Sequence, residues 1–314
     1  MPEWILGLDG GGTKTVLAIA NRVGTVQQVI AGTGINPFDN PGWQSELTRI
    51  LSHVSISPQE IAFSSFGMPG HNESDAVSAE QLNAARGWAG ERCEVQNDVA
   101  VAFTGALAGG SGVLVLAGTG SMAWGENTKH KVVRVGGWGQ GFGDEGSAHW
   151  IGLQALQKLS WTIDGRLLDA EFRRGLLEHI GIKEGELIAW FYALSHPRPK
   201  IAALAKAVDN LSGLGNLTAK HILLEAAQHL TQLGLAAQKQ LKLEQTSFSC
   251  AGSVFKSLMV RETVKHRLSS LGTWLEPVGT PLAGALFSAA QNAGWDVNQH
   301  WLKQINDELG RKPS

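Results

Sequence analysis

The sequence predicts an α/β protein made of two lobes of similar design, and three observations support this fold class. A unit of strand, glycine-rich turn and strand occurs near the N-terminus and again about one domain length later. The 314 residues are enough for two domains, and a hydrophobic content of 43% is enough for a real core. The 39 glycines are clustered, with thirteen of them between Gly105 and Gly146, and they show no three-residue period, which excludes a collagen-like chain.

The first lobe is predicted to alternate strands with helices, because short apolar runs alternate with segments of helical spacing. The predicted strands are Ile5–Leu8, Val16–Ala20, Val23–Ile30, Ile61–Phe66 and Glu94–Gln96, and the predicted helices are Trp43–Val54, Ser78–Ala89 and Val99–Ala108. Asp98 stands directly before the last of these helices, where an aspartate favours N-capping. We assign residues 1–107 to this lobe and expect residues 297–314 to be able to complete it.

The same pattern restarts in residues 108–296, which we assign to a larger second lobe with helical additions. The predicted strands are Val113–Ala117, Met122–Gly125, Val132–Val135 and Ser247–Ala251. The predicted helices run from the capping residue Ser147 to about Leu159, through a mostly helical stretch to Leu243 with one loop around Ser195–Pro199, from Ser253 to about Leu268, and over Leu282–Asn292 as the last long helix. No low-complexity linker separates the lobes, so we expect a shared hinge and a cleft between them.

Composition and charge exclude several classes of function. The formal net charge of −2, with no run of Lys or Arg, argues against nucleic acid as the main partner. Apolar runs such as Gly112–Ala117 are too short to span a bilayer, and no basic N-terminal region indicates a secretory signal. Cys93 and Cys250 are the two cysteines and show no pairing or metal spacing, so we expect a cytoplasmic protein.

The first glycine-rich turn follows a predicted strand as Asp9-Gly10-Gly11-Gly12-Thr13-Lys14. Consecutive glycines let backbone amides surround an anion, because no Cβ blocks the approach. We therefore predict that Gly11, Gly12, Thr13 and Lys14 bind nucleotide phosphates and that Asp9 lies near a hydrated Mg²⁺. The alternative is a plain glycine hairpin, but three glycines after an aspartate exceed what a hairpin needs. The spacing is not that of a Walker A loop.

The second turn, Gly118-Thr119-Gly120-Ser121, fits the loose dinucleotide fingerprint G-x-G-x-x-A. That fingerprint requires a helix immediately after the glycines, and the residues through Gly125 do not continue as a helix. A second phosphate-binding turn facing the first explains both turns together.

Polar residues near these turns each have a structural and a functional interpretation. Asp98 is either an N-cap or a general base that takes a proton from an attacking hydroxyl, and both can hold because a helix N-terminus favours the ionised form. Asp144 and Glu145, in a glycine-rich loop, either cap the next helix or accept hydrogen bonds from paired sugar hydroxyls. Asn36 is either a sugar contact or a plain turn residue.

Two such turns with an acidic residue between them resemble the actin/hexokinase-type fold, in which two ribonuclease H-like lobes enclose a nucleotide and sugar cleft. More specifically, the chain resembles the N-acetylglucosamine kinase branch of the BadF/BadG/BcrA/BcrD-type ATPase family. The matching segments are Leu8–Thr15, Leu116–Ser121, Gly136–Gly139, Gly143–Ser147 and Ala251–Val254, and the resemblance extends over about residues 4–290.

The resemblance implies a kinase that uses ATP and Mg²⁺ to phosphorylate the 6-hydroxyl of N-acetylglucosamine, with Asp98 as the base. It implies ATP contacts from Thr13, Thr119, Gly252, Ser253 and, because Lys200–Ala203 resembles a helix start beside the adenine, Ala202. It implies sugar contacts from Asn36, Gly120, Ser121, Met122, Gly139 and Asp144. Met122 stands where vertebrate-type N-acetylglucosamine kinases carry Asn, which leaves the identity of the amino sugar open.

Other functions remain open at this point. The acceptor sugar can instead be glucosamine, whose ammonium Asp144 and Glu145 could face, or N-acetylmuramic acid. The same ATPase family also suggests an activator of a dehydratase, which requires cysteines for an iron–sulfur cluster at a dimer interface. A non-catalytic sensor is disfavoured because the acidic residues Asp9, Asp98 and Asp144 are all present. The resemblance is compatible with a homodimer.

Overall fold

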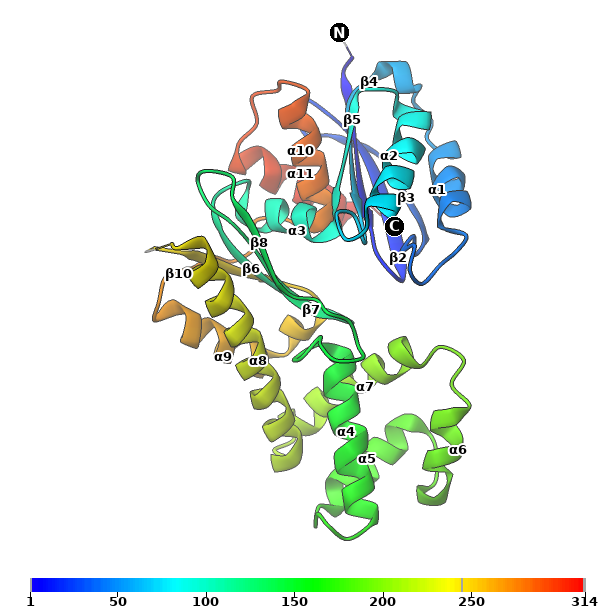
Figure 1. Cartoon of the computed structure of the whole chain (residues 1–314), viewed down its shortest axis with the longest axis vertical. Helices are drawn as coiled ribbons and strands as arrows, with labels where there is room; N and C mark the ends of the chain where they lie inside the picture. Colours follow the sequence, from blue (N-terminus) through cyan, green and yellow to red (C-terminus); the bar gives the residue numbers. More distant parts are fainter. Residues whose placement is uncertain (1, 244, 313–314) are drawn as a thin grey trace. The chain divides into compact units, whose positions relative to one another are not determined.

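The computed structural model describes residues 2–243 and 245–312, and the chain divides into two compact units (Figure 1). Unit 1 contains Met1–Gly110 together with Glu276–Ser314, and unit 2 contains Ser111–Leu275. The chain therefore returns to unit 1 at Glu276, and the helix predicted over Leu282–Asn292 belongs to unit 1 and not to the second lobe. No helix among the described residues is both long enough and apolar enough to cross a membrane.

Unit 1 is built on a five-stranded sheet with the order β3-β2-β1-β4-β5. Its strands are β1 (Trp4–Gly10), β2 (Lys14–Asn21), β3 (Val26–Thr33), β4 (Ile61–Met68) and β5 (Cys93–Asn97). The pairs β1–β2 and β2–β3 are antiparallel, whereas β1–β4 and β4–β5 are parallel. The carboxyl ends of the three parallel strands therefore meet at one edge of the sheet, the usual position for a ligand site.

Helices cover both faces of this sheet. They are α1 (Trp43–Ser52), α2 (Asp75–Ala89), α3 (Asp98–Leu107), α10 (Pro281–Asn292) and α11 (Gln299–Arg311), with a short 3₁₀ turn η1 (Pro58–Glu60). Successive side chains of a strand point to opposite faces, so Ile5 packs with α10 and α11 while Leu6 and Leu8 pack with α1 and α2. Figure 1 shows these two helix pairs on opposite sides of the strands. Burial of both faces explains why β1 is apolar almost throughout.

Unit 2 repeats the strand arrangement of unit 1. Its sheet has the order β10-β9-β6-β7-β8, formed by β6 (Gly112–Ala117), β7 (Ser121–Glu126), β8 (Val132–Gly136), β9 (Ser247–Ala251) and β10 (Thr273–Trp274). The pairs β6–β7 and β7–β8 are antiparallel, whereas β6–β9 and β9–β10 are parallel, as in unit 1. The prediction of two α/β lobes of similar design is confirmed.

The rest of unit 2 is helical. The helices are α4 (Ala148–Ile163), α5 (Ala170–Ile180), α6 (Leu187–Tyr192), α7 (Pro197–Gly213), α8 (Leu217–Leu241) and α9 (Leu258–Ser269), with 3₁₀ turns η2 (Glu184–Glu186) and η3 (Ser253–Lys256). The prediction of one loop between Leu159 and Leu243 is wrong, because the chain also breaks at Gly181 and Gly215, both with positive φ. Helices α4, α7 and α8 share one hydrophobic core with the sheet.

Helix ends show where the sequence predictions succeed and fail. Asn97, and not Asp98, is the N-cap of α3, since its side chain accepts a hydrogen bond from the Val99 amide at 3.0 Å. Asp98 is the first residue of that helix, although its Oδ1 also accepts from the Val99 amide. The prediction that Ser147 caps α4 is confirmed. Helix α11 follows the helix that we predicted to be the last one.

Candidate functional site

The turn between β1 and β2 leaves two backbone amides exposed at the edge of unit 1. The Gly11 amide donates to the Lys14 carbonyl at 3.0 Å, and the Gly11 carbonyl accepts from the Ile35 amide at 3.0 Å. The amides of Gly12 and Thr13 donate no hydrogen bond to any residue in 2–243 or 245–312, and both residues are exposed. A turn with exposed adjacent donors of this kind can bind an anion such as a phosphate.

Asn36 lies beside this turn because the loop after β3 packs directly on it. A Cβ atom at Gly34 would lie 2.1 Å from the Gly12 carbonyl oxygen, so only glycine allows the loop to approach so closely. The Asn36 amide nitrogen donates to Asp39 Oδ2 at 2.6 Å, and its Oδ1 accepts from the Phe38 amide at 3.1 Å. Asn36 is therefore held in a defined turn next to the exposed amides.

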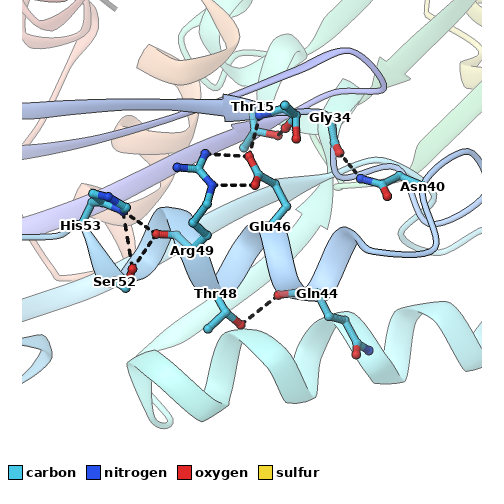
Figure 2. A network of polar contacts seen from close by, with 10 residues as sticks. Thr15, Gly34, Asn40, Gln44, Glu46, Thr48, Arg49, Ser52 and His53 are labelled. Carbon is cyan, nitrogen blue, oxygen red and sulfur yellow. Dashed lines mark hydrogen bonds and ion pairs between the residues drawn. The ribbon is translucent and has the colours of Figure 1, made fainter.

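Helix α1 fixes the start of the same loop through Glu46 (Figure 2). The Glu46 carboxylate accepts a hydrogen bond from the Thr33 amide at 2.6 Å and forms an ion pair with Arg49 at 2.7 Å. Arg49, with help from the Thr33 amide, lowers the pKa of Glu46 to about 2. Asn40 closes the other side of the loop by donating to the Gly34 carbonyl at 2.8 Å.

Two carboxylates, Asp9 and Asp98, lie at the carboxyl ends of the parallel strands of unit 1. Asp9 is near the end of β1, level with Gly67 of β4, and Asp98 follows the end of β5. The first turn of α3 packs against β4, since a Cβ at Gly67 would lie 2.4 Å from Val101 Cγ2. Burial, together with the negative charge of Asp98, raises the pKa of Asp9 to about 7. The two carboxylates are therefore within electrostatic reach of each other.

The oxygen donors of this pair suit Mg²⁺ better than a transition metal. Burial is the main cause of the raised Asp9 pKa and the charge of Asp98 adds to it, and a divalent cation bound at Asp9 would oppose both by favouring the ionised carboxylate. Within the described part of the chain, no group of three or more His, Cys, Asp or Glu side chains is placed to hold a metal ion. Mg²⁺ is usually bound by one or two carboxylates, and waters and substrate phosphates supply its other ligands. Asp9, with Asp98 nearby, matches this type of coordination.

The second turn, between β6 and β7 in unit 2, is fastened to the start of α4. The Gly118 amide donates to the Gly120 carbonyl at 2.9 Å, which closes the turn. The carbonyls of Gly118 and Thr119 accept from the amides of Ala148 and His149 at 2.8 and 3.4 Å. These carbonyl oxygens therefore satisfy amides that a helix N-terminus otherwise leaves unpaired.

Gly252 and Ser253 are brought to this second turn by β9, which pairs with β6. Gly252 has φ of +103°, and a Cβ there would lie 2.2 Å from the Ala117 carbonyl oxygen. Ser253 is exposed directly after it. Ala202 is half-buried on α7, near the crossing with α4, where a Cβ at Gly152 would lie 2.0 Å from the Ile201 carbonyl oxygen.

The remaining predicted sugar contacts of unit 2 surround the loop between β8 and α4. Ser121 fixes this loop by donating from its hydroxyl to the Glu145 carbonyl at 2.7 Å. A Cβ at Gly120 would lie 2.8 Å from Asp144 Oδ2, so these two residues are direct neighbours. Gly139 is half-buried with open space around it, whereas the Met122 side chain is buried beneath the loop. Met122 therefore packs under the site and does not project from it.

Arg198 is a residue of this group that sequence reasoning missed. Its Nη2 lies 2.9 Å from Asp144 Oδ2, and Asp144 is buried with φ of +58°. The sequence gives no signal for this ion pair, because Arg198 lies between Pro197 and Pro199 in a segment that we predicted to be a loop, 54 positions from Asp144. His149 is also buried there, and its pKa is lowered by that burial and then by the charge of Arg198, with Asp144 opposing.

The structure thus collects the predicted residues in two groups. Unit 1 holds Asp9, Gly11, Gly12, Thr13, Lys14, Asn36 and Asp98. Unit 2 holds Thr119, Gly120, Ser121, Met122, Gly139, Asp144, Ala202, Gly252 and Ser253. The methyl side chain of Ala202 cannot form a hydrogen bond. Ala202 is placed in this group only because of its position on α7.

Comparisons with known proteins point to sugar kinases. The family model for the BadF/BadG/BcrA/BcrD ATPase family matches residues 6–286. A Clostridium acetobutylicum protein named N-acetylmuramic acid/N-acetylglucosamine kinase is 29% identical over 239 residues, which cover 73% of this chain and 77% of that protein. The N-acetyl-D-glucosamine kinase of Dictyostelium discoideum is 27% identical over 263 residues, covering 77% of this chain and 81% of that protein.

A solved structure shows the same fold. It belongs to a candidate N-acetylglucosamine kinase of Chromobacterium violaceum and superimposes with a TM-score of 0.76 at 22% identity. The superposition covers 91% of this chain and 99% of that chain. The fold is therefore of the actin/hexokinase type, as the resemblance implied.

Proposed function

Because the chain belongs to the BadF/BadG/BcrA/BcrD ATPase family, we propose that it is an ATP-dependent amino-sugar kinase that phosphorylates the 6-hydroxyl of N-acetylglucosamine. Two curated relatives that carry amino-sugar kinase names support the activity and the substrate class. The observation that carries the proposal is the carboxylate pair of unit 1, in which Asp98 follows β5 and its charge helps to raise the pKa of the half-buried Asp9. A kinase of this kind needs one carboxylate for the attacking hydroxyl and another for the metal.

In this proposal Asp98 acts as the general base. It accepts the proton of the sugar hydroxyl while that oxygen attacks the γ-phosphorus of ATP and the bond from phosphorus to the β–γ bridging oxygen breaks, which releases ADP. The N-terminus of α3 favours a negative charge at this position, so the base is weak and acts mainly by orienting the hydroxyl. The proton is then passed to solvent after ADP leaves.

The phosphate groups of ATP are assigned to the two turns. The exposed amides of Gly12 and Thr13 donate to phosphate oxygens, and Lys14 adds a positive charge. Thr119, Gly252 and Ser253 contact ATP from unit 2, with Ala202 beside the adenine. Asp9 would hold Mg²⁺, which would supply positive charge against the negative charge on the transferred phosphoryl group.

The sugar is assigned to the remaining polar groups. Asn36 and Asp144 bind its hydroxyl or amide groups, and Gly120 and Gly139 allow the ring to approach the backbone. Ser121 supports the loop through its bond to the Glu145 carbonyl. Met122 packs beneath that loop and so shapes the site without a polar contact.

An ADP-release assay across a panel of sugars tests this proposal. We expect turnover with N-acetylglucosamine and weaker turnover with glucosamine and glucose, and the 6-phosphate should be identified by mass spectrometry and NMR. The proposal would be contradicted if no amino sugar or hexose raised the rate of ADP release above the rate measured without sugar.

The Asp98→Asn variant tests the assignment of the base. It should lower kcat by a factor of about 10² to 10⁴, as expected when a general base is lost, while the affinity for the sugar changes little. Asp75→Asn is the matched control, because Asp75 is likewise the first residue of a helix, α2, and has no role in the proposed site. Equal turnover of D98N and D75N would refute the role of Asp98.

The dehydratase-activator alternative has no specific observation in its favour. Cys250 is buried in β9, and Cys93 lies in β5 of the other unit. Burial raises the pKa of Cys93, which disfavours the thiolate that a cluster ligand must supply. Iron in the anaerobically purified protein would revive this alternative.

A further inference from the structure

The loop after β4 leaves the sheet of unit 1 between the two candidate carboxylates. Strand β4 lies between β1 and β5 in the sheet. Its last residues are level with Asp9 on one side and with Asn97, which precedes Asp98, on the other side. The loop residues 69–72 therefore begin at the edge of the sheet that carries both carboxylates.

Two contacts hold this loop against the elements of unit 1 that are assigned to the sugar. The Asn97 side chain donates from Nδ2 to the His71 carbonyl at 3.0 Å, so the His71 backbone lies beside the start of α3. On the other side, a Cβ at Gly70 would lie 2.6 Å from Cε2 of Phe38, and Gly70 has φ of +78°. His71 is therefore placed next to the helix of the proposed base and, through Gly70, next to the loop that carries Asn36.

A buried glutamine fixes the orientation and the tautomer of the His71 ring. Gln81 of α2 is fully buried, and its Nε2 donates to the Pro69 carbonyl at 2.9 Å. Because that carbonyl can only accept, Oε1 is the Gln81 atom that faces His71 Nδ1 at 3.0 Å. Oε1 also can only accept, so Nδ1 carries the hydrogen of the neutral imidazole, and Nε2 carries the lone pair.

The Nε2 atom of His71 is open to a ligand. It has no hydrogen-bond partner among residues 2–243 and 245–312, and it is not one of the enclosed polar atoms of that part of the chain, so it reaches solvent. The His71 side chain is half-buried. The loop thus presents one oriented hydrogen-bond acceptor at the edge of the sheet, and a hydroxyl is a group that such an acceptor binds.

The chemistry of a hexose indicates which hydroxyl that is. Carbon 6 is attached to carbon 5 of the ring, so the 4-hydroxyl is the ring hydroxyl closest to the 6-hydroxyl. A side chain beside the base that receives the 6-hydroxyl is therefore placed to meet the 4-hydroxyl first. A hydroxyl of the opposite configuration at carbon 4 points in another direction and loses this partner.

We propose that His71 is a specificity-determining residue whose Nε2 accepts a hydrogen bond from the 4-hydroxyl of the amino sugar. The inference rests on the proposed function, because it concerns the sugar that the kinase phosphorylates. Sites that hydrogen-bond a substrate hydroxyl reject analogues that lack it, because a polar group of the protein is then left without its partner. The enzyme therefore discriminates against 4-deoxy-N-acetylglucosamine and against N-acetylgalactosamine, in which the 4-hydroxyl is axial.

The test compares kcat/KM for N-acetylglucosamine and 4-deoxy-N-acetylglucosamine in the full-length protein. We expect the wild-type enzyme to prefer the sugar with the 4-hydroxyl about 10- to 100-fold. In His71→Asn the amide nitrogen can take the position of Nδ1 and keep the bond to Gln81, but no acceptor remains at the position of Nε2. This variant should lower kcat/KM for N-acetylglucosamine about 10- to 100-fold and change that for the 4-deoxy sugar by less than about twofold. His71→Gln, which places its amide near the position of Nε2, should retain part of the preference.

His53→Asn is the matched control. The His53 ring also uses Nδ1 for a hydrogen bond, with the Arg49 carbonyl at 2.7 Å, and the His53 carbonyl also accepts from a side-chain amide, that of Gln28, at 2.8 Å. His53 has no role in the proposed site, so H53N should change kcat/KM for neither sugar.

The inference is overturned if H71N keeps the wild-type preference for the 4-hydroxyl, which would mean that His71 only supports the loop through Gln81. It is also overturned if the wild-type enzyme phosphorylates both sugars equally well, an outcome that leaves the proposed function intact. Absence of turnover with either sugar contradicts the proposed function itself. If H71N does not fold, His71→Ala, which also lacks the acceptor, decides by the same ratio.

Discussion

The two glycine-rich turns begin from the same sequence pattern and the same strand arrangement, but their surroundings differ. In unit 1 the amides of Gly12 and Thr13 are exposed, and the nearby Asp9 faces the like charge of Asp98. In unit 2 the turn carbonyls are bonded to the start of α4, and Asp144 is paired with Arg198. Among the described residues, the turn of unit 1 therefore keeps two backbone amides without an acceptor and has two like charges nearby. In unit 2 the turn carbonyls accept hydrogen bonds and the charge of Asp144 is balanced by Arg198.

The two units therefore share a fold without sharing the chemistry of their turns. The strand order and sense are the same in both sheets, because the apolar patterns that specify them are alike. What differs is the segment that comes after the third strand of each sheet. It includes the loop 34–40 after β3 in unit 1 and helix α4 after β8 in unit 2. Matched substitutions in the two units can show which contacts support the stability of the shared fold and which support the activity of one unit alone.

The largest effect is expected from Gly34→Ala and Gly252→Ala, each of which adds a Cβ against one of the two turns. The new atom would lie 2.1 Å from the Gly12 carbonyl oxygen or 2.2 Å from that of Ala117. Overpacking of this kind costs about 1–3 kcal/mol or more, and Gly252→Ala should cost the larger amount because of its positive φ. Urea unfolding and ADP release would measure both variants, and turnover should fall at least about tenfold if ATP phosphates bind these turns.

Gly87→Ala is the control for this pair. Gly87 is exposed within α2, and a Cβ there would have no atom within 4 Å. Its replacement should raise the free energy of unfolding by about 0.5–1 kcal/mol, because alanine favours a helix. Normal turnover and stability in G34A or G252A would show that the corresponding turn is not held as described.

The next effect concerns the helix caps beside the two sites. Asn97→Ala removes the cap of α3 and the hydrogen bond from Asn97 Nδ2 to the His71 carbonyl at 3.0 Å, whereas Ser147→Ala removes the cap of α4 alone. We expect losses of about 2 kcal/mol and about 1 kcal/mol in the free energy of unfolding. N97A should also lower kcat more than S147A, because it frees the helix turn that carries Asp98. A larger loss of stability in S147A would contradict this ranking.

The smallest effect is expected from Glu46→Gln, and it depends on pH. The pKa of Glu46 is lowered from 4.5 to about 2 in the folded protein, so its ionised form stabilises the fold above pH 4.5 and this contribution disappears as the pH falls toward 2. The difference in unfolding free energy between wild type and E46Q should therefore be constant near pH 6 and shrink between pH 4.5 and 2. Urea unfolding at several pH values would measure it, and a difference that grows in acid would contradict the description.

Much of the fold could be predicted from the sequence because its signals are local. Apolar runs next to glycine turns predicted β1, β2, β6 and β7, and Ser147 predicted a cap. The cap of α3 was placed one residue late because Asn97 and Asp98 are adjacent and both favour N-caps. Helix α11 was missed although Trp301, Leu302 and Ile305 are buried, because this apolar stripe is short and lies among polar residues.

The candidate site was predictable only where its residues are close in sequence. The amides that follow Asp9 belong to one turn, and their exposure follows from the glycines. The contact of Gly34 with Gly12 and the pair of Arg198 with Asp144 depend on how distant segments pack, so no spacing rule could indicate them. The bonds of the second turn to α4 likewise join residues about 30 positions apart.

The insertion of unit 2 between Gly110 and Glu276 has a consequence for synthesis on the ribosome. The strands of unit 1 leave the ribosome first, but α10 and α11, which cover the face that contains Ile5 and Ala18, leave last. Unit 2 is continuous and is free to fold as it emerges, while one apolar face of the nascent N-terminal unit waits for the C-terminus. Exposed apolar surface of this kind recruits chaperones, and a chain truncated before α10 would leave incomplete the unit that was made first.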